Sequence, residues 1–330
     1  MLNYINKNCN YKRICIFTIA LIMLAATVGI GYCNEIYSKK DNFNRDLTKI
    51  TNKKSSILLV DINTGYIIGM SNKNIAYKGY TVGSLAKIIT ATALLEKGII
   101  TSEQTYDCKG YKVINGKKIY CWNSSGHGKN NIESALAKSC NLFFLNYSKK
   151  LNYKDLMDYY KIYKLDSRRQ ISDSIEIPEF NLPINGLNTS VALGTDQKIL
   201  ISPLSMLSLA STMARNGEYK PLWINKNTNN SDSVKLDIKP STISRIQNGM
   251  TLSGKEGTAN LFSKKGYNVA AKTGTAPYGK DRKHGWVIGY YPANKPQIAF
   301  CVFVMDGTGS LDAVPIAIKV LNLCKKYHYI

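Results

Sequence analysis

The sequence predicts an α+β fold, in which an antiparallel sheet is flanked by helices and a mostly helical subdomain. Two short β-rich runs, 56–61 and 66–70, flank the turn residues Asn63-Thr64-Gly65 and predict a hairpin. Three more strand-like runs lie close together at 268–276, 284–292 and 297–307, and Pro and Gly clusters separate them. Helical patterns dominate the stretch between the two groups. The two strand sets can therefore join in one sheet, with helices packed beside it.

Four helices are predicted from apolar spacing and end signals. They lie at 84–97, ended by Gly98, at 131–151, at 201–217, with Ser202 as the cap and Pro203 in the first turn, and at 310–327. Residues 105–130 are expected to form loops and short strands. Residues 34–55 are polar and lack apolar periodicity, so we predict a tether there and a globular domain at 56–330.

The charge of the chain is strongly positive, and it bears on the class of partner. Lys and Arg number 44 against 22 Asp and Glu, for a net charge of +22. Nucleic-acid binding would account for such a charge. No basic run is interleaved with stacking aromatic residues, however, so we interpret the charge as a solvated surface and expect no nucleic-acid partner. Weak attraction to anionic lipids or wall polymers stays open.

The N-terminal residues predict a membrane anchor. Residues 1–13 carry three basic side chains and no acidic one, and Ile14 to Tyr32 follow without a charge. That length spans a bilayer, and the basic flank should stay in the cytoplasm. We therefore expect residues 1–33 to form a cytoplasmic tip and a single-pass anchor in the cytoplasmic membrane, with the catalytic domain outside. A cleaved signal peptide and lipidation at Cys33 are the alternatives.

The eight cysteines leave two questions open. Cys108 and Cys121 flank a short segment, and a disulfide between them is one prediction for an oxidising compartment. Two unpaired, small hydrophobic side chains are the alternative. The sequence has no CxxC or HxxxH spacing and only three histidines, so we expect no metal site. His127, between two glycines, is expected to order a loop.

A serine and a lysine at the start of the helix at 84–97 suggest nucleophilic chemistry. Ser84 and Lys87 are three residues apart, so they share one face of the helix and can touch. The positive N-terminus of a helix disfavours an ammonium group, and burial lowers the pKa of a lysine. A neutral Lys87 could accept the proton of Ser84 and make that serine a nucleophile.

Two further short motifs follow in a fixed order. Ser139-Cys140-Asn141 comes about 50 residues after the first motif, and Lys272-Thr273-Gly274 lies on a strand about 130 residues further on. Each tripeptide alone is common. The order and spacing of SxxK, SxN and KTG are the signal, because this set occurs in penicillin-binding proteins and class A β-lactamases.

The sequence resembles the transpeptidase domain of penicillin-binding proteins. The stretches VDINTGYIIGMS, GHGKNNIESALAKSCNLFF, ALGTDQKILISPLSMLSLASTMARNG and AAKTGTA, the last followed by HGWVIGYYPANKPQIAFCVFVMDG, are similar to segments of that family. The resemblance covers roughly residues 56–325. It implies a β-lactamase/transpeptidase-like fold, and it implies serine acyl transfer without a cofactor.

The resemblance assigns roles to the residues of the first two motifs. Ser84 is implied to be the acylated nucleophile, and Lys87 its general base. Ser139 is implied to relay a proton toward the leaving amine. Asn141 is implied to hold Lys87 and a substrate amide.

The third motif is implied to bind the substrate. Lys272 supplies positive charge near Ser139, and Thr273 binds the terminal carboxylate of the substrate. Gly274 lets the strand come close to the ligand. The backbone N–H groups of Ser84 and Thr275 form the oxyanion hole.

The implied activity is a D-alanyl-D-alanine transpeptidase that acts on peptidoglycan stem peptides and binds β-lactams. The alternatives are a class D-like β-lactamase, a D,D-carboxypeptidase and an inactive wall-binding scaffold. Val82 stands where the family commonly has proline, which is a change in a loop. Only about 20 residues separate the predicted anchor from the domain, so we expect glycan polymerisation to come from a separate partner.

Overall fold

The computed structural model describes residues 39–52, 54–114, 116–167, 169–172, 175–177, 188–224 and 232–330. The chain divides into two compact units, residues 1–45 and 46–330. The predicted anchor, Ile14 to Tyr32, lies outside the described residues. Among the helices that are described, none has the length and apolar character needed to cross a membrane.

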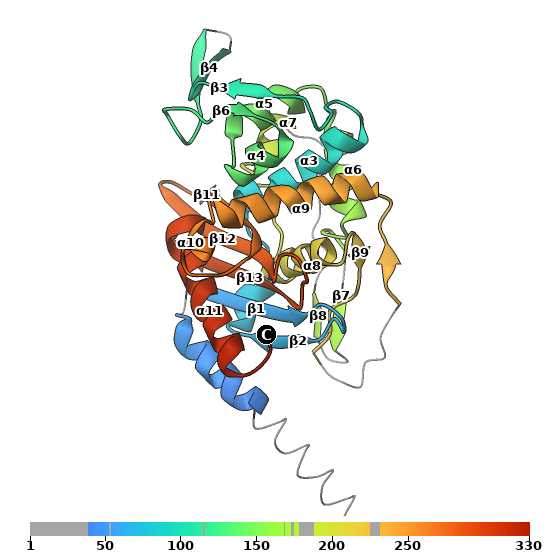
Figure 1. The fold of residues 1–330 in the computed structure, drawn as a ribbon, viewed down its shortest axis with the longest axis vertical. Coiled ribbons are helices and arrows are strands. Elements are labelled where there is room, and N and C mark those ends of the chain that lie inside the picture. Colours follow the sequence, from blue (N-terminus) through green and yellow to red (C-terminus); the bar gives the residue numbers. More distant parts are fainter. Residues whose placement is uncertain are drawn as a thin grey trace, which may run out of the picture. The chain divides into compact units, whose positions relative to one another are not determined.

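A five-stranded antiparallel sheet forms the centre of the second unit (Figure 1). Its strands, in spatial order, are β11 (Ala270–Tyr278), β12 (Arg282–Tyr291), β13 (Ile298–Met305), β1 (Ser55–Asp61) and β2 (Ile67–Met70). Leu58 of β1 lies opposite Cys301 of β13, so the N-terminal hairpin joins the C-terminal strands edge to edge. The prediction that the two strand sets form one sheet is confirmed.

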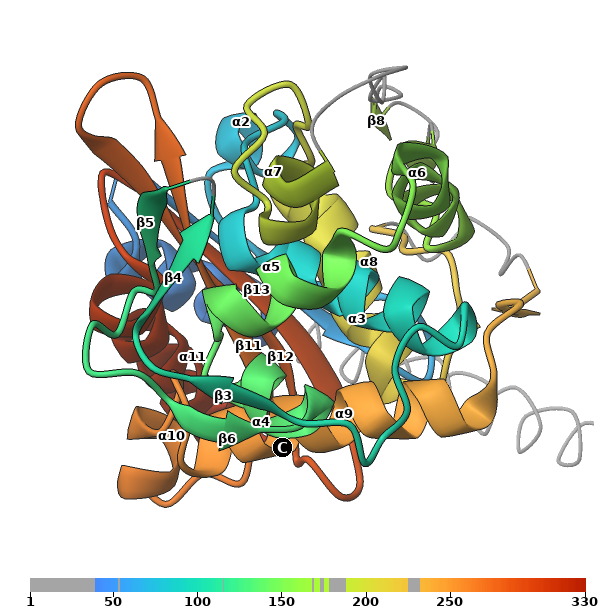
Figure 2. The ribbon, with the colours of Figure 1, turned by 90° about the horizontal axis from the view of Figure 1, so that it is seen from above.

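Helices cover both faces of this sheet. Helix α8 (Pro203–Ala214) packs on β13, β12 and β1, and α11 (Val314–Lys326) packs on β13 and β12. Figure 2 shows these two helices on opposite sides of the strands. The residues from Ile298 to Val304 in β13 are all buried, as expected for a strand that is covered on both faces. Ser202 caps α8 as predicted, because its side chain accepts a hydrogen bond from the Ser205 N–H.

A mostly helical subdomain adjoins the sheet. Its helices are η1 (Gly83–Leu85), α3 (Ala86–Glu96), α4 (Ile132–Ala137), α5 (Asn141–Ser148), α6 (Tyr153–Ile162) and α7 (Asn188–Leu193). It also contains two strand pairs, in which β3 (Tyr106–Cys108) pairs with β6 (Gly128–Asn130) and β4 (Tyr111–Ile114) pairs with β5 (Lys117–Tyr120). Every residue of α3 from Ala86 to Leu94 is buried. A helix that is apolar all round belongs in a core, and α3 is the centre of this subdomain.

The other elements connect these two parts. They are α2 (Lys73–Ala76), β7 (Arg169–Ser172), β8 (Ile175–Ile177), β9 (Glu218–Tyr219), β10 (Val234–Lys235), α9 (Pro240–Lys255), α10 (Leu261–Lys264) and the π-helical turn η2 (Gly309–Ala313). Helix α9 packs on both α4 and β11, so it links the helical subdomain to the edge of the sheet.

The helix predicted at 131–151 is wrong in one respect, because it is two helices. Ser139 has a φ of 54°, which ends α4 in the left-handed region, and the Cys140 N–H donates to the Ala135 carbonyl. Helix α5 then starts at Asn141. Apolar spacing continues through the break, so the pattern did not reveal it. The break turns Ser139 and Asn141 toward α3.

The residues just before β1 are more ordered than the predicted tether suggests. Residues 39–50 are helical, and the second unit begins at Asp46 rather than at 56. The Asp46 carboxylate accepts hydrogen bonds from Lys326 Nζ at 2.8 Å and from the Tyr327 hydroxyl at 2.9 Å. These bonds lower the pKa of Asp46, with the Lys326 bond the largest cause. Leu47 is fully buried beside them.

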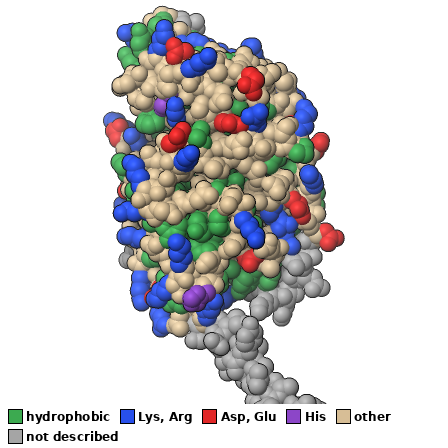
Figure 3. All heavy atoms as spheres, in the orientation of Figure 1, with side chains coloured by type: hydrophobic (Ala, Val, Ile, Leu, Met, Phe, Trp, Pro, Cys, Tyr) green, Lys and Arg blue, Asp and Glu red, His purple; other side chains and the backbone are tan. Residues whose placement is uncertain are grey.

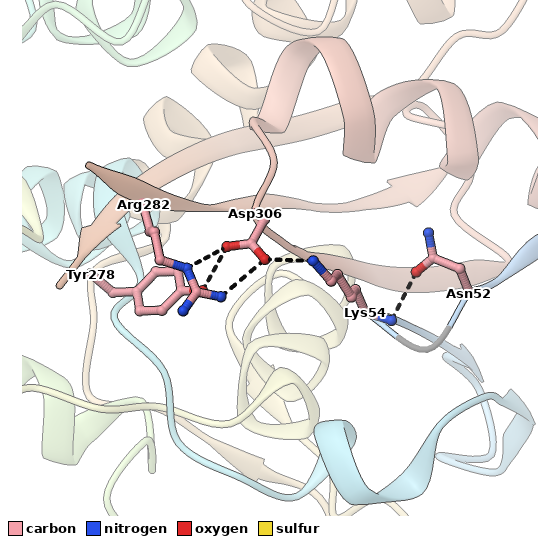
Figure 4. A network of polar contacts seen from close by, with 5 residues as sticks. All are labelled: Asn52, Lys54, Tyr278, Arg282 and Asp306. Carbon is pink, nitrogen blue, oxygen red and sulfur yellow. Dashed lines mark hydrogen bonds and ion pairs between the residues drawn. The ribbon is translucent and has the colours of Figure 1, made fainter. Parts of the chain in front are cut away.

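A polar network ties the β11–β12 hairpin to the start of β1 (Figure 4). Both carboxylate oxygens of Asp306 accept bonds from the Arg282 guanidinium, at 2.8 and 3.0 Å. The Tyr278 hydroxyl and Lys54 Nζ donate to the same carboxylate, and the Asn52 side chain accepts from the Lys54 N–H. The bond from Arg282 is the largest cause that lowers the pKa of Asp306. The network therefore fastens the turn end of the hairpin.

Replacing Gly254 with alanine should destabilise the domain. A Cβ at this position of α9 would lie 1.9 Å from the Val269 carbonyl oxygen, so α9 would have to move away from β11. We expect the free energy of unfolding to fall by about 1–3 kcal/mol, measured by chemical denaturation. Ser244→Ala, at an exposed position of α9, is the control and should change it by less than about 0.5 kcal/mol. Equal stability of the Gly254→Ala variant and the unsubstituted protein would contradict the close packing.

Candidate active site

The three sequence motifs meet at one cavity. Its volume is about 410 Å³, and predicted site residues from all three motifs line it: Ser84, Ser139, Asn141, Thr273 and Thr275. The two lysines of the motifs lie beneath this lining and are fully buried. Segments that are far apart in the sequence, at η1, at the α4–α5 break and on β11, thus supply one site.

The position of Ser84 depends on a glycine. Ser84 lies in η1, directly before α3, and Gly83 has a φ of +55°. A Cβ on Gly83 would lie 2.5 Å from the Thr275 carbonyl oxygen, so only glycine lets η1 lie this close to β11. This close approach brings the Ser84 hydroxyl and the backbone of Thr275 to the same cavity.

Lys87 is held in the geometry of a base. Its Nζ lies 3.1 Å from Ser84 Oγ, and it donates to the Ser139 carbonyl at 2.9 Å and to Asn141 Oδ1 at 2.5 Å. A neutral amine has two N–H groups for the two carbonyl oxygens, which leaves its lone pair for the Ser84 hydroxyl. Burial lowers the pKa of Lys87 to about 8. Lys87 can therefore take the Ser84 proton.

Ser139 lies between two lysines. Its Oγ is 3.2 Å from Lys87 Nζ and 3.0 Å from Lys272 Nζ, and Lys272 also donates to the Thr273 carbonyl at 2.8 Å. Burial lowers the pKa of Lys272 well below its ordinary value, and the charge of Lys87 lowers it further. Two buried ammonium groups around one hydroxyl repel each other, so the pair gives up one proton readily. From the sequence we predicted that Lys87 itself is the neutral amine. The contacts around Ser139 indicate instead that Lys87 and Lys272 titrate as a pair that together lacks one proton.

The third motif forms one wall of the cavity. Lys272, Thr273 and Thr275 lie on β11, where Thr273 faces Val287 and Thr275 faces Gly285 of β12. A Cβ on Gly274 would lie 2.8 Å from the Val82 carbonyl oxygen, so this glycine lets β11 approach the segment before Ser84. The close contact of Gly274 is thus with another segment of the protein, whereas the family resemblance implied that this glycine lets the strand approach the ligand.

Five further residues line the cavity that the sequence did not single out. They are Trp122, Thr258, Pro277, Lys283 and Ser310. The Thr258 hydroxyl lies 2.6 Å from Thr273 Oγ1, and the Trp122 indole N–H donates to the carbonyls of Lys138 and Ser139. Thr258 lies in the turn that follows α9, and no local sequence pattern points to its role.

A cluster of cysteines lies directly behind the second motif. The side chains of Cys108, Cys121, His127 and Cys140 place their sulfur and nitrogen atoms within 4.8 Å of one another. Cys108 and Cys121 are free thiols, not the disulfide that was one prediction. The expectation of no metal site rested on local spacing, and here the fold gathers donors from residues far apart in the sequence.

Comparison with known sequences agrees with these motifs. A family model described as the penicillin binding protein transpeptidase domain matches residues 55–322. Stage V sporulation protein D of Bacillus subtilis (strain 168) is 28% identical over 265 residues, covering 73% of this chain and 41% of that protein. Peptidoglycan D,D-transpeptidase PbpA of Mycolicibacterium smegmatis is 23% identical over 257 residues, covering 71% and 51%. The chain spans about half, or less, of the length of these relatives.

Solved structures show the same fold. Penicillin-binding protein PBP2 of Helicobacter pylori, from its complex with MreC, superposes with a TM-score of 0.76 at 19% identity over 88% of this chain and 63% of that chain. A chain from a peptidoglycan synthase complex, solved to describe coordinated polymerization and crosslinking, has a TM-score of 0.75 at 22% identity over 87% and 59%. Since the family model matches from the first strand to the last helix and its three motifs line one cavity, the chain belongs to the family of penicillin-binding protein transpeptidase domains.

Proposed function

We propose that this protein is a serine-type D-alanyl-D-alanine transpeptidase that acts on peptidoglycan stem peptides. One observation carries the proposal: Lys87 Nζ lies 3.1 Å from Ser84 Oγ, while its N–H groups are engaged by two carbonyl oxygens. The relatives named peptidoglycan D,D-transpeptidases support the choice of reaction. Because the chain covers only part of those proteins, their activity is carried over as a proposal.

In the first step, Ser84 Oγ attacks the carbonyl carbon between the two terminal D-alanines of the stem peptide. The hydroxyl proton passes to Lys87, and the carbonyl oxygen becomes an oxyanion. Ser84 and Thr275 both line the cavity, and their backbone N–H groups are the proposed donors that stabilise that oxyanion. The C–N bond then breaks, and the proton on Lys87 passes through the Ser139 hydroxyl to the leaving amine, which leaves Lys87 neutral. The products are free D-alanine and an acyl-Ser84 ester.

In the second step, an amine from a neighbouring stem peptide attacks the ester. The amine gives a proton to Lys87, the C–O bond to Ser84 breaks, and Lys87 returns that proton to Ser84 Oγ. The new amide bond is the cross-link. Water in place of the amine would give a D,D-carboxypeptidase, and rapid hydrolysis of an acylated β-lactam would give a β-lactamase. The first experiment below separates the β-lactamase from the proposed activity, and the two D,D-peptidase activities differ only in the acceptor, amine or water, that attacks the ester.

Substrate binding relies on the third motif. A stem peptide ends in a carboxylate, and the Thr273 and Thr275 side chains line the cavity as hydroxyl donors. Lys272 lies behind Thr273 and, once protonated, offers a buried positive charge. An arriving carboxylate would favour a charged Lys272, and the missing proton would then fall on Lys87. Binding of the correct substrate would thereby prepare the base.

The setting proposed for this reaction is the outer face of the cytoplasmic membrane, with Ile14 to Tyr32 as the anchor. A separate glycan polymerase is the proposed partner, supported by the structural relative from a complex that couples polymerization to crosslinking. Figure 3 shows Lys and Arg spread over one face and not gathered in a stripe, which supports a partner other than nucleic acid.

Acylation should depend on Ser84. We expect a fluorescent penicillin to label the full-length protein stably, and we expect no label on Ser84→Ala, because the acylated oxygen is absent. The measurement is in-gel fluorescence of the two proteins side by side, and Ser310→Ala, at the rim of the cavity, is the control that should keep its label. Rapid loss of label with drug hydrolysis would identify a β-lactamase. No label on folded, unsubstituted protein would favour an inactive scaffold.

The rate of acylation should follow a bell-shaped pH curve. When both Lys87 and Lys272 are protonated, no base is available, so the rate should rise as the pair loses its first proton. At higher pH the second proton is lost, and with it the charge that binds the carboxylate. Labelling rates measured from about pH 5 to pH 10 test this curve.

A matched variant checks the origin of the alkaline limb. Lys272→Arg places a charge that does not titrate at the third motif, so the fall of the rate at high pH should be weaker than in the unsubstituted protein. If the rate of the unsubstituted protein instead climbs steadily to high pH, acylation does not need the last proton on the Lys87–Lys272 pair.

Thr258 should assist substrate binding through Thr273. Thr258→Val removes a hydroxyl 2.6 Å from Thr273 Oγ1 while it keeps the side-chain shape. We expect the acylation rate constant to fall about fivefold, which corresponds to about 1 kcal/mol for one hydrogen bond. Thr251→Val, at a half-buried position of α9 outside the cavity lining, is the control. Equal rates for Thr258→Val and the control would show that the contact is not used.

A further inference from the structure

The cysteine cluster behind the second motif has the composition of a metal site. Cys108, Cys121 and Cys140 are buried free thiols, and His127 Nδ1 faces two of them. Three thiols and one imidazole form a donor set that structural zinc sites use. A disulfide between any two of the cysteines would leave the third sulfur and the imidazole without a function.

The distances within the cluster fit tetrahedral coordination. His127 Nδ1 lies 3.6 Å from Cys108 Sγ and 3.5 Å from Cys121 Sγ. In a tetrahedral site with ordinary Zn–S and Zn–N bond lengths, the nitrogen and a sulfur lie about 3.5 Å apart and two sulfurs about 3.8 Å apart. All four donor atoms lie within 4.8 Å of one another, so the cluster would close by no more than about 1 Å around an ion.

The backbone holds this cluster in place without the ion. The Cys121 N–H donates to the Gly110 carbonyl at 2.8 Å, and the His127 N–H donates to the Cys108 carbonyl at 2.9 Å. A Cβ on Gly126 would lie 2.2 Å from the Cys108 carbonyl oxygen, and Gly126 has a φ of +85°. The two ends of the 108–127 segment therefore lie in contact. The three potential ligand atoms of this segment, Cys108 Sγ, Cys121 Sγ and His127 Nδ1, lie close together.

The fourth donor connects the segment to the active site. Cys140 lies between Ser139 and Asn141, at the left-handed turn that aims both side chains at Lys87. Trp122, next to Cys121, packs its ring 5.2 Å from the His127 ring and donates to the Ser139 carbonyl. A group bound to all four donors would fasten the 108–127 segment to that turn.

We propose that Cys108, Cys121, His127 and Cys140 bind one Zn²⁺ ion, which fixes the 108–127 segment against the turn that carries Ser139 and Asn141. On binding, the three thiols lose their protons to solvent, so the site holds three thiolates, a neutral imidazole and Zn²⁺, with a net charge of −1. All four positions are filled by protein, so the ion is structural and leaves no coordination site for substrate.

The test is the metal content of the full-length protein, purified in detergent without chelators and incubated with zinc alone. We expect about one zinc per chain by mass spectrometry of the metal, and a Co²⁺-loaded sample should show the absorption of a tetrahedral thiolate site. Cys108→Ala should lower the zinc affinity more than about tenfold. Cys324→Ala, which removes a buried thiol outside the cluster, should bind zinc as before.

Other results would overturn the proposal. A protein that binds less than about a tenth of a zinc per chain under these conditions has no such site. An intact mass two hydrogens lighter, with a cross-linked peptide joining two of the cluster cysteines, would show a disulfide instead. The cobalt spectrum and the intact mass are measured on the unsubstituted protein, so they decide the matter even where Cys108→Ala does not fold. Neither depends on acylation, so this test is independent of the proposed transpeptidase activity.

Discussion

The amine of Lys87 is the contact on which the site depends. It is fully buried, and in one small volume it meets the Ser84 hydroxyl, the Ser139 carbonyl and hydroxyl, and the Asn141 amide oxygen. A buried ammonium is costly, so this position favours the neutral base. The same contacts hold the first two motifs together, so one side chain serves both the arrangement of the site and its chemistry.

The surrounding fold delivers the other groups to this amine. Helix α3 is buried from Ala86 to Leu94, so Lys87 lies inside the core, and the left-handed turn at Ser139 brings the second motif next to it. Strand β11 supplies Lys272, whose Nζ contacts the Ser139 hydroxyl, and Gly83 lets the turn that carries Ser84 lie against the same strand. In the proposed mechanism the site needs no histidine, because two lysines in unequal surroundings divide the roles of base and electrostatic anchor.

The sequence predicted the sheet, the long helices and the motif residues, because each has a local signature in spacing, caps or strand-forming residues. It missed the break at Ser139, since a left-handed residue leaves the apolar pattern around it unchanged. It also missed Thr258 and the convergence of Cys108 with Cys140. Those contacts join segments that are distant in sequence, and only the fold brings them together.

The central claim is that Ser84 is the nucleophile and Lys87 its base. The most direct measurement is mass spectrometry of peptides from the full-length protein after reaction with benzylpenicillin. The account predicts a single acyl adduct on the peptide that contains Ser84, and its loss in Lys87→Met, where the base is absent. An adduct on Cys140, or an equal yield of adduct in Lys87→Met, would contradict it.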